Sequence, residues 1–104
     1  MKVLTLGHQY ELANFENKDA AGQVLQFIHK EPTAEGSTEL QTLSDGATNE
    51  EVLEVLIDRL KFLNGKFPCR ENAIVITKLE ESLMWLNKRT TDRIARQVEG
   101  KQLA

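Results

Sequence analysis

Residues 69–100 read CRENAIVITKLEESLMWLNKRTTDRIARQVEG, and this stretch decides the fold. Between Cys69 and Glu99 it contains neither glycine nor proline, the two residues that most often interrupt a helix. Apolar residues recur at the three- and four-residue spacing of one helix face: Ile76, Leu79, Leu83 and Leu86. The pattern predicts one long helix that ends at Gly100.

A second helix is predicted immediately before it, within SDGATNEEVLEVLIDRLKFLNG. Thr48 is a suitable N-cap, and Glu51 three residues later completes a capping box. Gly65 and Pro68 are typical of a helix end. Because only a short turn separates the two helices, we expect an antiparallel αα-hairpin over residues 47–100.

The preceding residues, 1–46, are predicted to be rich in β-structure. Strand candidates are KVLTLG (2–7), QVLQFIHKEP (23–32) and the weaker STELQTL (37–43). The polar stretch NFENKDAAG (14–22) is predicted to be a loop. The expected fold class is α+β, with a small antiparallel sheet followed by the helical hairpin in a single domain of residues 1–104.

Composition narrows the class of protein. The chain is 40% hydrophobic and 28% charged, as expected for a globular protein. No apolar run approaches the ~20 residues that cross a bilayer, and no signal peptide is predicted. Cys69 is the only cysteine, which excludes an intrachain disulfide and fits a reducing cytosol.

Charge is distributed unevenly along the chain. Residues 1–58 carry a formal charge of −8 and residues 59–104 a charge of +5. The basic half suggests an anionic partner, although the two halves attracting each other would explain it equally well. The net charge of −3 argues against binding to duplex DNA, which needs a broad basic surface.

The apolar residues of the helices cover more than one face. Ile74, Met84 and Trp85 lie outside the leucine stripe of the long helix. A hairpin and a small sheet cannot easily cover apolar residues on several sides of the helices. We therefore expect a homo-oligomer formed by symmetric pairing of hairpins. The alternative is that the sheet covers these residues.

Three arginines, Arg89, Arg93 and Arg96, share one edge of the long helix beside the leucine stripe. Guanidinium groups match phosphate oxygens, so the three could bind an anionic ligand. The alternative, which the spacing alone slightly favours, is that they stabilise the helix C-terminus through its dipole, with Asp92 pairing with Arg96. The spacing alone leaves both interpretations open.

An aromatic ring and an amide provide a second candidate site. The hairpin turn brings Phe62 close to Asn72, where a ring could stack on a base and an amide could bind a purine edge. Core packing is the alternative role for Phe62. Signals for catalysis are weak, since His8 and His29 lack nucleophilic or metal-spaced partners and no phosphate-binding glycine loop is present.

Taken together, GQVLQFIHKEP and the block from DGATNEEV to RQVEG resemble the Thoeris anti-defence sponge family of phages, in its first described type. The pieces FPCREN, ITKLEESLMWLNKRT and DRIARQVEG carry most of this resemblance. The second block is also similar to the helical hairpin of anti-CBASS cyclic-nucleotide sponges. The resemblance covers nearly the whole chain.

The resemblance implies a non-catalytic protein that sequesters glycocyclic ADP-ribose signals in the host bacterial cytoplasm and so blocks Thoeris signalling. Some members of the family form hexamers and also bind cyclic di- or trinucleotides. Their ADP-ribose-type ligand lies where two subunits meet. By position, the implied ligand-binding residues here are Phe62 for stacking, Asn72, the phosphate-binding Arg89 and Arg93, and Thr91.

The expected protein is therefore a homo-dimeric or hexameric nucleotide sponge, with no cofactor, metal or membrane partner. The resemblance assigns no role to Arg96. The main alternative is a structural or partner-binding helical hairpin without a nucleotide ligand. A nucleotide-hydrolysing enzyme is a third, weaker hypothesis.

Overall fold

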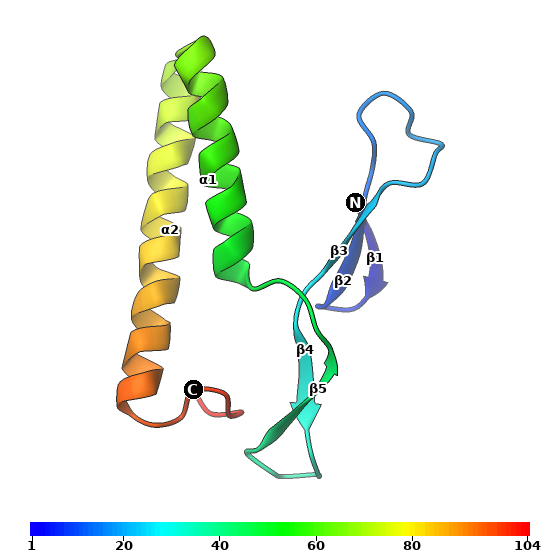
Figure 1. The fold of residues 1–104 in the computed structure, drawn as a ribbon, viewed down its shortest axis with the longest axis vertical. Coiled ribbons are helices and arrows are strands. Elements are labelled where there is room, and N and C mark those ends of the chain that lie inside the picture. Colours follow the sequence, from blue (N-terminus) through cyan, green and yellow to red (C-terminus); the bar gives the residue numbers. More distant parts are fainter. The chain divides into compact units, whose positions relative to one another are not determined.

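The computed structural model describes residues Met1–Ala104, which divide into two compact units (Figure 1). The N-terminal unit, Met1–Thr48, contains all the strands, and the hairpin unit, Asn49–Ala104, contains both helices. Small antiparallel sheets followed by an αα-hairpin confirm the predicted α+β class. A single domain over residues 1–104 stays a prediction.

Five short strands form two antiparallel sheets in the N-terminal unit. Their bounds are β1 Lys2–Thr5, β2 Gln9–Leu12, β3 Gln23–Gln26, β4 His29–Pro32 and β5 Leu40–Ser44. The first sheet has the order β1-β2-β3, and β4 pairs with β5 in the second. Tyr10 lies opposite Val3 on one neighbouring strand and opposite Leu25 on the other. These three side chains therefore share one face of the first sheet.

The prediction of one strand over residues 23–32 is wrong, because the chain changes partner after Gln26. Ile28 donates its N–H to the carbonyl of Ala47 at 2.9 Å, and Ala47 donates to the carbonyl of Gln26 at 2.9 Å. Gly46 approaches this segment so closely that a Cβ there would lie 2.4 Å from the Gln26 carbonyl oxygen. Glycine permits that approach, and the approach separates β3 from β4.

The other β predictions hold in outline. The candidate at 2–7 is present as β1, and the candidate at 37–43 appears slightly later, as β5. The loop predicted at 14–22 contains no strand. Strand β2 was not predicted, although it is the central strand of its sheet.

Two antiparallel helices, α1 at Asn49–Lys66 and α2 at Arg70–Ala95, form the hairpin (Figure 1). Helix α1 begins directly after Thr48, the expected N-cap. Cys69 is the N-cap of α2, and its Sγ accepts a hydrogen bond from the Asn72 N–H at 3.4 Å. Neither helix contains a segment long and apolar enough to cross a membrane.

The prediction that the long helix ends at Gly100 is wrong, since α2 ends at Ala95. Gln97 adopts a left-handed conformation, with φ 60°, although it is not a glycine. The Val98 N–H then bonds back to the carbonyl of Arg93 at 3.0 Å. This is the reversal of a Schellman cap, and it ends the helix without glycine.

The hydrophobic core is small and lies in the hairpin. Ile57 on α1 and Ile76 on α2 are the buried hydrophobic residues, each 8% exposed. The rest of the predicted leucine stripe is half-buried, which confirms it as the packing face of α2. Large apolar residues remain exposed on both helices: Val55, Leu56, Phe62, Ile74, Val75, Met84, Trp85 and Ile94. Self-association through this surface stays a prediction.

Candidate functional site

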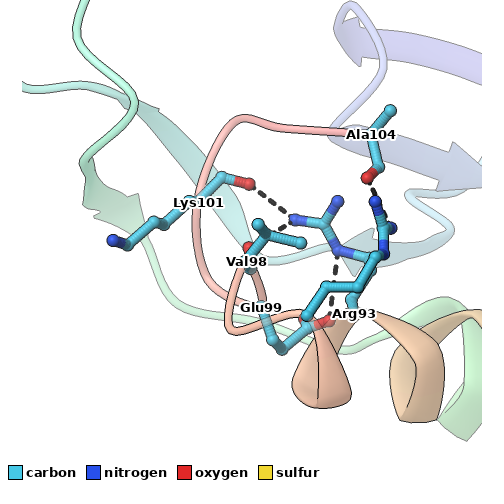
Figure 2. A network of polar contacts seen from close by, with 6 residues as sticks. Arg93, Val98, Glu99, Lys101 and Ala104 are labelled. Atoms are coloured by element: carbon cyan, nitrogen blue, oxygen red, sulfur yellow. Dashed lines mark hydrogen bonds and ion pairs between the residues drawn. The ribbon is translucent and has the colours of Figure 1, made fainter.

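Arg93 holds the chain reversal that follows α2. Its side chain is only 4% exposed, and its Nε donates to Glu99 Oε2 at 3.2 Å. Its Nη2 donates to two backbone carbonyl oxygens, of Val98 at 2.8 Å and of Lys101 at 2.7 Å. Figure 2 shows the guanidinium enclosed by these acceptors. Arg93 thus links the last turn of α2 to the residues that follow the helix, 96–104, which we call the C-terminal segment.

One nitrogen of this guanidinium is not used within the chain. Nη1 of Arg93 is buried and has no hydrogen-bond partner. A buried N–H group without a partner costs about 1–3 kcal/mol, more when the group is charged. The network therefore leaves one nitrogen unpaired inside the chain, and an acceptor from outside could reach it only if residues 96–104 moved aside.

The other two arginines of the predicted cluster have different environments. Arg89 is exposed on α2, and its guanidinium makes no hydrogen bond or ion pair within the chain. Arg96 is the C-cap of α2, and its Nη2 donates to the carbonyl oxygen of Ala104 at 2.6 Å. The alternative pairing of Arg96 with Asp92 is not formed; Asp92 Oδ2 instead accepts from Lys88 Nζ at 2.7 Å.

The three arginines therefore do not present one common cationic surface in the isolated chain. Arg89 is available to a ligand, while Arg93 and Arg96 bind the C-terminal segment. Thr91, the other predicted site residue in this part of α2, is exposed. We call Arg89, Thr91 and Arg93 the arginine half-site.

Phe62 and Asn72 lie near the turn of the hairpin and form what we call the aromatic half-site. The Phe62 ring is 59% exposed, which argues against the core role considered for it. Lys66 Nζ lies 4.6 Å from the ring centroid, a cation–π contact that adds positive charge beside the ring. The Asn72 side chain is half-buried, and its backbone N–H is occupied by Cys69.

An open depression on α1 lies beside the Phe62 ring, with a volume of about 490 Å³. Its lining residues all come from α1: Glu54, Val55, Asp58, Arg59 and Phe62. The two carboxylates outnumber the single guanidinium of Arg59, so this depression suits the uncharged face of a base better than a phosphate.

The two half-sites are far apart within one chain. The helix rises about 1.5 Å per residue, so Asn72 and Arg89 are separated by about 25 Å along α2. A nucleotide-sized ligand cannot bridge that distance. The predicted site residues therefore fall into two groups that a single hairpin does not bring together.

Sequence reasoning missed two contributors to these half-sites. Lys66 follows Phe62 by one helical turn, a spacing that a search for neighbouring side chains would have found. The acceptors around Arg93 were hidden, because the stretch containing Glu99 was assigned to the helix.

The hairpin of this chain matches a known protein family. The model of the family "Acb2/Tad1, hairpin domain" matches residues 26–91, which include Phe62, Asn72, Arg89 and Thr91. Arg93 lies just beyond the matched stretch.

The chain is also 57% identical over 58 residues to "Thoeris anti-defense 1" of Bacillus phage SBSphiJ7. That stretch is 55% of this chain and 41% of the relative, so the chain spans less than half of the relative's length. The family match covers more than half of the present chain. The family resemblance found in the sequence is thereby confirmed, and the chain belongs to the Acb2/Tad1 hairpin-domain family.

Proposed function

We propose that this protein is a phage or prophage anti-defence sponge acting in the host bacterial cytoplasm. It binds glycocyclic ADP-ribose without degrading it and so keeps the Thoeris signal from its effector. Membership of the hairpin family and identity to a Thoeris anti-defence protein support this role. The observation that carries it is the pair of complementary half-sites on one hairpin, one aromatic and one cationic.

The pocket forms between subunits. Two hairpins packed in antiparallel fashion bring the aromatic half-site of one chain beside the arginine half-site of its partner, in two equivalent copies. The exposed apolar side chains of both helices supply the surface for this pairing. The assembly is therefore a homo-dimer or a hexamer built from such dimers.

Each predicted side chain has a chemical role in that pocket. Phe62 stacks on the adenine base, and the Asn72 amide hydrogen-bonds to a polar edge of the ligand. Arg89 binds the pyrophosphate with a guanidinium that has no partner in the chain. Arg93 adds positive charge beside Arg89, and its buried Nη1 can donate to the phosphate only once residues 96–104 move aside. The Thr91 hydroxyl lines the same wall.

The expected affinity follows from these contacts. Nanomolar binding requires about −12 kcal/mol. Stacking contributes about 1–3 kcal/mol per base, and each charge-assisted hydrogen bond about 1.5–3 kcal/mol. An enclosed pocket with one stacked base and several guanidinium contacts reaches this range.

Sequestration suits these groups better than hydrolysis. The two half-sites offer an aromatic ring, an amide, a hydroxyl and guanidinium groups, which bind phosphates and bases. A hydrolase would also need a general base or a metal-activated water beside the scissile bond. We therefore propose a binding protein and not an enzyme.

A second function is favoured by one specific observation. Arg93 and Arg96 are engaged with the C-terminal segment, as expected if they stabilise the end of α2. In this alternative the hairpin is a structural or partner-binding element, and no nucleotide binds.

A capture experiment separates these functions. The protein is incubated with glycocyclic ADP-ribose, freed of unbound ligand by ultrafiltration and heat-denatured, and the released material is analysed by mass spectrometry. Intact ligand identifies a sponge, altered ligand an enzyme, and no ligand the structural alternative. Cyclic di- and trinucleotides in the same assay test the second ligand class of the family.

A pair of matched variants tests whether Arg89 lines the ligand pocket. Arg89→Ala should abolish capture, whereas Lys78→Ala removes an exposed cation elsewhere on the same helix and should leave capture intact. Native mass spectrometry of the loaded protein then gives the number of subunits. A monomer that holds ligand would overturn the two-subunit pocket.

A further inference from the structure

Two histidines and a glutamate meet in the N-terminal unit, whereas the residues of both half-sites belong to the hairpin unit. The imidazole rings of His8 and His29 are stacked, with centroids 3.7 Å apart and planes 11° from parallel. His29 Nε2 lies 2.8 Å from Glu31 Oε1. One nitrogen or oxygen ligand atom from each residue lies within 4.8 Å of the others.

The backbone fixes this arrangement. Gly7, with φ 79°, turns the chain between β1 and β2, and the His8 N–H bonds to the Thr5 carbonyl at 3.0 Å. The His8 carbonyl accepts the N–H of Phe27 at 2.8 Å, which places His8 beside the residues that enter β4. The cluster is therefore part of the fold and not a chance meeting of flexible side chains.

The carboxylate belongs to the same strand as His29. Glu31 follows His29 by two residues on β4, and their 2.8 Å contact shows that the two side chains lie together despite the register irregularity between His29 and Lys30. The His29 side chain is 16% exposed and the Glu31 side chain 49% exposed. The cluster is thus partly protected and still open to an ion from solvent.

The donor set is that of a transition-metal site. Imidazole nitrogen and carboxylate oxygen bind Zn²⁺ at about 2.0–2.2 Å, and tetrahedral geometry places such ligand atoms about 3.3 Å apart. The separation between His29 and Glu31 is already near that value. Stacked rings direct their lone pairs nearly parallel, so one imidazole has to rotate for both to bind the same ion.

A second observation shows why an ion would matter here. No residue of Met1–Thr48 is buried in the isolated chain, so this unit has no hydrophobic core of its own. Cys69, the one cysteine, lies in the other unit, and a disulfide is therefore not available. Units of this size without a core usually need a metal, a disulfide or a partner chain.

We propose that His8, His29 and Glu31 form a zinc site that links the β1–β2 turn to β4. Three protein ligands leave the fourth tetrahedral position to water. The ion connects the three-stranded sheet to the two-stranded sheet and stabilises the N-terminal unit. Sequence spacing could not show the site, because 20 residues separate the histidines along the chain and metal-binding motifs are recognised at short spacing.

The test uses untagged full-length protein with Cys69→Ser as the background. This change removes the one thiol that could bind zinc and keeps an oxygen that can cap α2. Equilibrium dialysis against Zn²⁺ measures stoichiometry and affinity, and Co²⁺ absorption reports tetrahedral coordination. We expect about one ion per chain and a rise in the melting temperature with Zn²⁺.

Substitutions of the proposed zinc-binding residues test whether they form the site. His8→Ala and His29→Ala should each weaken Zn²⁺ binding by about tenfold or more, since even outer-shell changes cost that much. Glu35→Gln, at an exposed turn of the same unit, is the matched control and should bind as the parent does. Unchanged binding in both histidine variants, or no stoichiometric binding by the parent, would overturn the proposal. In that case the cluster would be only a stacked pair of rings with a hydrogen bond between His29 and Glu31.

Discussion

The two units of this protein are ordered by different means. The helices of the hairpin unit satisfy their backbone hydrogen bonds internally and pack around Ile57 and Ile76. The N-terminal unit has no buried residue, and its short strands depend on one another across two sheets. The hairpin is therefore a scaffold on which ligand groups can be held, whereas the N-terminal unit has no buried residue to stabilise it.

The largest loss of stability is expected from a substitution in the hairpin core. Ile76→Ala removes one of the two buried isoleucines and should lower the free energy of unfolding by about 3 kcal/mol. Leu25→Ala, a half-buried residue of β3, should cost about 1 kcal/mol. Urea unfolding followed by circular dichroism measures both. Equal costs would show that the N-terminal unit is packed as firmly as the hairpin.

The next effect concerns ligand affinity. Phe62→Ala should weaken binding of glycocyclic ADP-ribose by about 2 kcal/mol, because it removes the stacking surface. Lys30→Glu reverses an exposed charge in the N-terminal unit and should leave affinity unchanged. Isothermal titration calorimetry of both variants compares the two units directly. A loss of affinity in the Lys30 variant alone would move the pocket out of the hairpin.

A smaller effect is expected at the end of α2. Glu99→Gln removes the carboxylate partner of Arg93 and should cost about 1 kcal/mol, since Glu99 is itself 43% exposed. Hydrogen exchange should become faster in residues 96–104 and stay unchanged in the N-terminal unit. Unaltered exchange in that segment would show that the two carbonyl contacts of Arg93 hold it without the carboxylate.

The smallest effect is a gain in stability. Gln97→Gly relieves a left-handed backbone in a non-glycine residue and should stabilise the hairpin by about 0.5 kcal/mol. Thermal unfolding measured beside the parent tests this, with Gln102→Gly as the control. A lower melting temperature for the Gln97 variant would mean that its side chain makes contacts that outweigh the strain.

The hairpin was largely predictable because its signals are local. Capping residues, the absence of glycine and proline, and a repeating leucine stripe indicated both helices. The end of α2 was not predictable in the same way, because it depends on Arg93 reaching acceptors in the following turn. Hydrogen bonds from a side chain to backbone carbonyls produce no repeating pattern of residues in the sequence.

The sheets and the candidate site were harder to predict, because they depend on contacts between residues far apart in the sequence. The break between β3 and β4 is caused by the approach of Gly46, far along the chain. The distinct environments of the three arginines likewise follow from the C-terminal segment and not from helical spacing. Helical spacing placed them on one edge but could not show which of them remains available to a ligand.

The distance between the half-sites has a genetic consequence under the two-subunit pocket proposed above. A chain with Phe62→Ala binds weakly alone and a chain with Arg89→Ala does not bind, because every pocket in their homo-oligomers lacks one group. In a mixed pair, both lesions fall in one pocket, and the other pocket receives an intact half from each chain. Two defective alleles expressed together should therefore complement, and mixed pairs should recover half of the normal binding capacity.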